Sequence, residues 1–168
     1  ERRKWIHCFD NVDAVIFVAA ISEYDQVLFE DETVSRIDEA VTLFEEVYGS
    51  RFFTNSAMVL FLNKKDLFEQ KLHKVDIRFE GDEFHPPRFL DYTYGTLSDD
   101  MDEEEYARVF GSAQDYMTNL FLATVDDDRR PIHVHQTTAI DKRNVETVFN
   151  AAKEIILRHN IEGSGFMD

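Results

Sequence analysis

Two polar stretches follow apolar runs in a way that suits ligand binding. The first lies in FLNKKDLF, residues 61–68, where Asn63, Lys64 and Asp66 come directly after an apolar run. The second is TTAIDKRNV, residues 137–145, which follows the apolar PIHVHQ segment. Open α/β sheets bind ligands at the carboxyl ends of their strands, so two such loops at one edge could enclose a planar ligand.

Helix capping explains the same residues without a ligand. Asn and Asp are favoured at the start of a helix because their side chains accept hydrogen bonds from free backbone N–H groups. In this alternative, Asn63 and Asp66 cap a helix that starts at Leu67, and Asp141 or Asn144 caps the next helix. Spacing alone favours capping over ligand binding.

The elements around these loops alternate between strand and helix. Three segments rich in β-branched and other apolar residues predict buried parallel strands, at 12–20, 57–63 and 131–137. Apolar residues recur every three or four positions from Val34 to Tyr48, before Gly49, and again from Val145 to Ile156. This order predicts an α/β sheet with right-handed crossovers.

Composition restricts the function further. The chain has 168 residues, the usual size of one domain, and a formal net charge of -16, which disfavours nucleic acid as a partner. The single cysteine, Cys8, excludes an internal disulfide and suits a reducing compartment, with the cytosol as the default. We expect the chain to be part of a longer protein, because it begins without Met and its strands need neighbours.

One segment departs from the alternation. Residues 74–102 contain HPP and the acidic run DYTYGTLSDDMDEEE begins within them. We expect a solvated surface loop that leads into a helix with Glu and Asp in its first turn, where they suit the helix dipole.

Four sequence blocks together resemble a known family. They are ERRKWIHCF at the start, VAAISEYDQVLFEDETVSRIDEAVTLFEEV, FLNKKDLF and TTAIDKRNVETVF. In this order and spacing they resemble the second half of the GTPase domain of heterotrimeric G protein α subunits, from within switch II to the C-terminus. The resemblance covers nearly all of residues 1–168. It implies a three-layer, P-loop NTPase-type (Ras-like) fold whose phosphate-binding loop and helical domain are not in this segment.

The resemblance gives the first polar stretch a specific chemistry. Guanine presents N1–H beside its exocyclic amine, and an ionised carboxylate accepts both bonds, which makes Asp66 the expected reader of the base. The resemblance implies that Asn63 bonds to the base and the neighbouring loop, and that the stem of Lys64 lies along the ring. It also implies that the loop at Thr138 and Ala139 binds guanine, with the Ala139 N–H meeting O6.

Partner-binding residues are also implied by the resemblance. Residues 1–9 resemble the second half of switch II, and residues 30–36 resemble switch III. In the activated state Arg2 is expected to pair with Glu39 on the following helix. The residues implied to contact partners are Arg2, Lys4, Trp5, His7, Cys8, Glu39 and, near the receptor-binding end, Phe166.

The implied function belongs to the intact parent protein. It is a slow GTPase that switches between GTP and GDP and couples a seven-transmembrane receptor to effectors. Its partners are the βγ dimer, the receptor, effectors and RGS-type proteins, at the cytoplasmic face of the plasma membrane. No catalytic residue and no Mg²⁺ ligand is expected in this segment. Two alternatives stay open: a hydrolysis-deficient nucleotide-binding scaffold, and a small-ligand or ATP-using α/β enzyme in which NKKD is only a turn.

Some residues depart from the family pattern or invite other interpretations. Ile140 stands where threonine is usual, and the acidic region from Glu80 to Glu105 is unusual for the family. His133 and His135 alternate along one expected strand, as a metal-binding pair would. No third ligand follows at a fitting spacing, so we expect no metal there.

Overall fold

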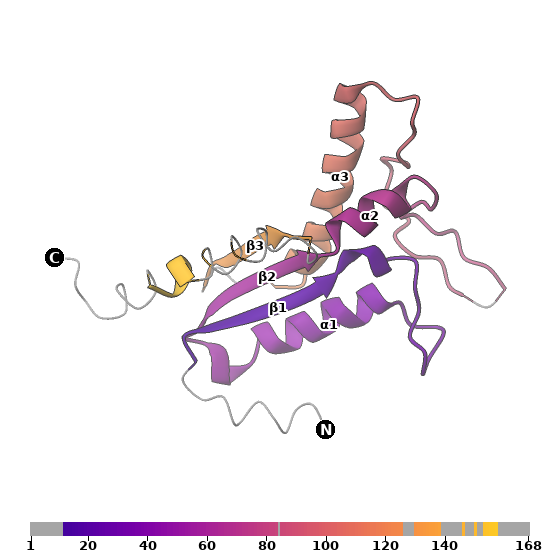
Figure 1. The fold of residues 1–168 in the computed structure, drawn as a ribbon. Coiled ribbons are helices and arrows are strands. Elements are labelled where there is room, and N and C mark those ends of the chain that lie inside the picture. Colours follow the sequence, from indigo (N-terminus) through magenta and orange to yellow (C-terminus); the bar gives the residue numbers. More distant parts are fainter. Residues whose placement is uncertain are drawn as a thin grey trace.

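The computed structural model describes residues 12–83, 85–125 and 130–138, together with 146, 150 and 153–157 (Figure 1). In chain order its elements are β1 (Ala14–Ala20), the 3-10 turn η3 (Ile21–Glu23), α1 (Arg36–Tyr48), the 3-10 turn η4 (Arg51–Phe53), β2 (Ala57–Asn63), α2 (Lys65–Leu72), α3 (Glu103–Leu122) and β3 (Ile132–Gln136).

The three strands form one parallel sheet in the order β1-β2-β3. This arrangement confirms the predicted α/β class and the three predicted strands, although β1 starts at Ala14 rather than Val12. The register pairs Ala20 with Asn63 and Leu62 with Gln136. All three strands therefore end at the same edge of the sheet.

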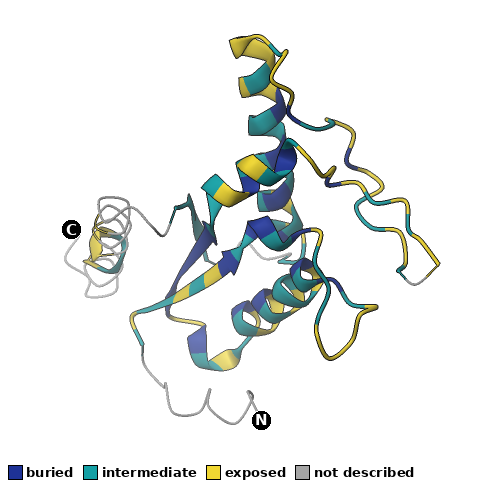
Figure 2. Cartoon of the chain, turned by 45° about the vertical axis from the view of Figure 1, so that its right-hand side comes forward, coloured by how far each residue is buried: buried dark blue, intermediate teal, exposed yellow. Residues whose placement is uncertain are grey.

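Two helices cover one face of this sheet. The ring of Phe17 on β1 lies 5.2 Å from that of Phe44 on α1 and 6.5 Å from that of Phe121 on α3. On the opposite face of β1, Ile16 and Val18 are 48% and 56% exposed. The burial colours follow this difference, since β2 is buried along its length whereas β1 alternates (Figure 2).

The first long helix begins and ends as its sequence predicts. Ser35 caps α1, because its hydroxyl oxygen accepts a bond from the Ile37 N–H at 3.2 Å. Gly49 follows the last residue, and its N–H bonds to the Glu45 carbonyl. Phe44 and Tyr48 are buried on the inner face of this helix, as the spacing indicates.

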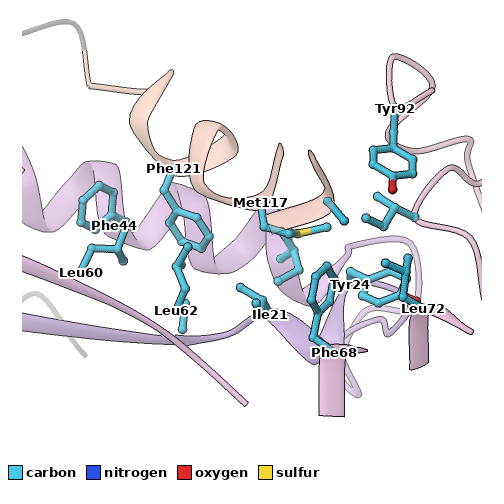
Figure 3. Close-up of a cluster of buried hydrophobic side chains, with 14 of the residues drawn as sticks. Ile21, Tyr24, Phe44, Leu60, Leu62, Phe68, Leu72, Tyr92, Met117 and Phe121 are labelled. Atoms are coloured by element: carbon cyan, nitrogen blue, oxygen red, sulfur yellow. The ribbon is translucent and has the colours of Figure 1, made fainter. Parts of the chain in front are cut away.

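The segment between α2 and α3 is not simply a solvated loop, which corrects the expectation from its charge. Ile77, Tyr92 and Leu97 are buried in the main core, although their neighbours in sequence are mostly exposed. Figure 3 shows Tyr92 at one end of this core, on the side of Leu72, while Phe121 lies toward the other end. The expected acidic helix does follow, and α3 starts at Glu103.

Two further points concern helices within the described residues. Within the described residues, no helix combines the length and apolar character that crossing a bilayer requires. Residues 153–157 are helical, while most of the closing helix predicted over 145–156 lies outside the described residues.

Candidate functional site

The carboxyl ends of the three strands bring polar residues together. Strand β1 runs into η3, which ends at Glu23, and β2 ends at Asn63. Strand β3 is followed by Thr137, whose N–H bonds to the Leu62 carbonyl at 2.9 Å. Figure 1 shows η3 and α2 side by side at this end of the sheet. This is the edge where open α/β sheets place their ligands.

Asn63 ties the loop after β2 to the end of β3. Its Oδ1 accepts one bond from the Lys64 N–H at 2.8 Å and another from the Thr137 hydroxyl at 3.2 Å. The Lys65 N–H donates to the Thr137 carbonyl at 3.1 Å. Asn63 therefore holds the two predicted loops against each other, as the resemblance implies for its contact with the neighbouring loop.

Lys64 adopts a backbone conformation that a lysine rarely takes. Its φ of 62° and ψ of 38° lie in the left-handed region, which costs on the order of 1 kcal/mol for a residue with a side chain. The Asn63 oxygen holds the Lys64 N–H in this position. A conformation that is strained and held in place is a feature of binding sites more than of ordinary helix starts.

The capping alternative is wrong for this loop. Helix α2 starts at Lys65 rather than Leu67, its N-cap residue is Lys64, and no side chain caps it. Asp66 lies in the first turn, half-buried, and none of the described residues bonds to its carboxylate. The proposed caps of the next helix, Asp141 and Asn144, lie outside the described residues.

A residue that sequence analysis missed joins this edge from η3. One carboxylate oxygen of Glu23 lies 2.7 Å from Lys64 Nζ and the other lies 3.3 Å from Arg36 Nη1. Burial raises the pKa of Glu23, but the hydrogen bonds from Lys64 and Arg36 outweigh it and hold the pKa below its ordinary value. Its position just after the first strand, at the binding edge, was the signal that could have identified it.

The remaining predicted residues are only partly within the described structure. Thr138 is half-buried next to Thr137, and Glu39 lies in the first turn of α1. The expected pair of Arg2 with Glu39 stays a prediction. The other predicted residues outside the described structure are Lys4, Trp5, His7, Cys8, Ala139 and Phe166.

His133 and His135 both lie on β3. The His135 ring packs against Phe61 with centroids 5.6 Å apart, and its Nε2 is buried without a bond to any described residue. No group of three or more metal-ligating side chains occurs among the residues placed by the structure.

The chemistry available at this edge is that of recognition. The Asp66 carboxylate, which has no bonding partner among the described residues, can accept two neighbouring N–H donors from a planar ligand. Lys64 adds a flexible apolar stem whose ammonium is already held by Glu23. An adenine ring lacks the adjacent donor pair that such a carboxylate requires, so the arrangement suits a base of the guanine type.

Known proteins with similar sequences identify the family of this chain. The guanine nucleotide-binding protein alpha-1 subunit of Mycosarcoma maydis is 41% identical over 99% of this chain, which spans 42% of that protein. The alpha-3 subunit of Caenorhabditis elegans and the G(o) alpha subunit of Lymnaea stagnalis are 39% and 38% identical over 98% of the chain, which spans 41% of each. A family model described as G-protein alpha subunit matches residues 1–156, and the chain therefore belongs to the G-protein alpha subunit family.

Proposed function

We propose that the edge formed by Asn63, Lys64, Asp66 and Thr138 binds the guanine base of GDP and GTP. The observation that carries the proposal is the Asp66 carboxylate, which lies at the ligand-binding edge of the sheet and has no bonding partner among the described residues. The loop that presents it is already ordered through Asn63. A preorganised site loses less conformational entropy when it binds its ligand.

Each residue has a separate task in this proposal. Asp66 in its ionised form accepts the N1–H and amine bonds of guanine, which are charge-assisted and therefore strong. Lys64 lays its methylene stem along the face of the ring. Thr138 leads into Ala139, whose backbone N–H is proposed to donate to guanine O6.

Membership of the family supports a proposal for the wider role. The relatives named above are guanine nucleotide-binding alpha subunits, and this chain spans less than half of each. We infer that the intact protein is a slow GTPase whose GDP and GTP states couple a seven-transmembrane receptor to effectors. Its proposed partners also include the βγ dimer and RGS-type proteins, at the cytoplasmic face of the plasma membrane.

Magnesium would assist the phosphate end of such a nucleotide by neutralising its charge. The part of the chain that the structure describes contains no cluster of three metal-ligating residues. We propose that the ligands of this magnesium ion lie elsewhere in the intact protein.

The decisive experiment is nucleotide competition on the full-length protein with Asp66→Asn. Xanthine carries a carbonyl acceptor where guanine carries its amine, so an asparagine amide at position 66 should favour xanthine. We expect wild type to prefer guanine over adenine nucleotides by about 10⁴-fold in the favourable limit, and the variant to prefer xanthine nucleotides over guanine nucleotides.

A matched control lies on the same helix. Glu69 accepts a bond from the Tyr106 hydroxyl at 2.9 Å, toward α3, so Glu69→Gln removes a similar charge without touching the proposed base contact. This variant should keep the preference for guanine. A folded Asp66→Asn protein with the same base preference as wild type would refute the proposed reading of the base.

A further inference from the structure

We propose that Glu23 is a positioning residue of the base site, and that through Arg36 it connects this site to the loop of residues 26–35. The inference rests on the proposed function, because the group that Glu23 positions is the side chain of Lys64. The contact itself is short, with 2.7 Å between Lys64 Nζ and Glu23 Oε1. It joins residues 41 positions apart in sequence.

The first step of the argument concerns the freedom of Lys64. A lysine side chain has many rotamers, and holding it along a base costs conformational entropy. Glu23 fixes the ammonium end before any ligand arrives, while Asn63 fixes the backbone end at the N–H. The stem of Lys64 is therefore held at both ends, which lowers the entropy lost when a base binds.

The second step concerns the other oxygen of the same carboxylate. Arg36 Nη1 lies 3.3 Å from Glu23 Oε2, and Arg36 Nε donates to the Val27 carbonyl at 3.0 Å. The loop of residues 26–35 is a hairpin closed by the bridge between Val27 and Ser35. A movement of this hairpin that displaces Arg36 would therefore release the carboxylate that orients Lys64.

A neighbouring ion pair shows which feature is specific. Asp25 lies in the turn just after η3, and its Oδ1 is 2.6 Å from Nζ of Lys71, which lies on α2. The side chains of Glu23 and Asp25 are similarly exposed, at 24% and 28%. Asp25 bonds to the C-terminal part of α2, whereas Glu23 bonds to Lys64, the N-cap residue between Asn63 and the first turn of α2 that carries Asp66.

The test compares Glu23→Gln with Asp25→Asn in the full-length protein. The first readout is the dissociation rate of GDP, which we expect to rise about threefold in Glu23→Gln, as suits a partly exposed ion pair, and to stay at the wild-type rate in Asp25→Asn. Lys64→Gln should have a similar effect. Glu23→Gln and Lys64→Gln each remove the same ion pair. GDP should therefore dissociate from the double variant no faster than from Lys64→Gln alone.

Two further readouts separate positioning from a general loss of structure. Glu23→Gln should keep the preference for guanine over adenine, because Asp66 is untouched, whereas a disrupted loop would lose it. In nucleotide-free protein, amide hydrogen exchange across residues 63–68 should be faster in Glu23→Gln than in Asp25→Asn. Arg36→Gln should give a smaller change in the same direction.

The outcomes distinguish this inference from the proposed function. If wild type binds guanine nucleotides and Glu23→Gln matches Asp25→Asn in both dissociation and exchange, the positioning role is wrong and the base site stands. Additive effects of Glu23→Gln and Lys64→Gln would also overturn it. If wild type has no preference for guanine, the proposed function is wrong. Equal amide hydrogen exchange across residues 63–68 in Glu23→Gln and Asp25→Asn would then also show that Glu23 does not order this loop.

Discussion

The NKKD loop and the segment of residues 74–102 are both irregular, charged and adjacent to α2, yet they are held in opposite ways. The loop is fixed by polar bonds through Asn63 and Glu23, and the carboxylate of Asp66 is left without a described partner. Segment 74–102 is fixed by buried Ile77, Tyr92 and Leu97, and most of its charged side chains are exposed.

This difference separates charged residues that are placed to bind a ligand from charged residues that lie on the exposed surface. At the loop, each polar contact orients a group toward the ligand edge of the sheet. In segment 74–102, the charged side chain next to Tyr92 bonds instead to α3, where the Asp91 carboxylate accepts a bond from the Tyr116 hydroxyl at 2.6 Å. The position of a charged residue relative to the strand ends is thus more informative than the number of charges around it.

The largest effect expected from this comparison is the loss of folding stability when Tyr92 is replaced. The side chain is 1% exposed, its ring lies 5.1 Å from that of Tyr116, and its hydroxyl donates to the Gly95 carbonyl at 2.8 Å. We expect Tyr92→Ala to lower the free energy of unfolding by about 3 to 5 kcal/mol, through loss of burial and the cavity left behind. Urea denaturation of wild type and variant at the same fixed GDP concentration measures this difference in the free energy of unfolding.

Tyr92→Phe provides the control, because it removes only the hydroxyl bond and should cost about 1 kcal/mol. The preference for guanine should be unchanged in both variants, provided that segment 74–102 takes no part in reading the base. A variant that stays folded and loses this preference would show that the two regions are not separate in function.

A smaller effect on stability is expected at Asn63, together with an effect on binding. Asn63→Ala leaves the Lys64 N–H without its bond, and an unpaired, half-buried donor costs about 1 to 3 kcal/mol. Because the left-handed conformation of Lys64 loses its support, GDP should also dissociate faster. Parallel measurement of urea denaturation and GDP release checks both effects.

Thr137→Val is the companion variant for this loop. It removes only the second bond to the Asn63 oxygen and keeps the Thr137 backbone bonds to Leu62 and Lys65. Its effects should have the same direction as those of Asn63→Ala and be smaller. Unchanged GDP release in both variants would contradict a binding role for this polar network.

The sequence was sufficient where local pattern and family motif agree. Apolar periodicity predicted α1 with its end at Gly49, and runs of β-branched residues predicted three parallel strands. The same strand ends pointed to Asn63, Lys64 and Asp66 as neighbours of the second loop. In each case the information lies within a few residues of the chain.

The remaining features depend on contacts between distant segments. Glu23 meets Lys64 because the register places Ala20 beside Asn63, and no local pattern around Glu23 indicates this contact. Tyr92 lies in an acidic run that predicts exposure, but its burial depends on the packing of Leu72 and α3. Lysine has no intrinsic preference for the left-handed backbone of Lys64, and the Asn63 oxygen that bonds to its N–H is itself bonded by Thr137, 74 positions away.

The smallest expected effect concerns the charges at the end of segment 74–102. Asp102 caps α3, because its Oδ1 accepts a bond from the Glu105 N–H at 2.8 Å. Asp102→Ala should lower the free energy of unfolding by about 1 kcal/mol, whereas Asp100→Ala removes the same charge from an exposed position with no cap and should change it far less. Equal losses in urea denaturation would mean that the acidic run acts through its net charge. A loss confined to Asp102→Ala, with GDP release unchanged, would assign this carboxylate to the helix and leave recognition to the edge at Asp66.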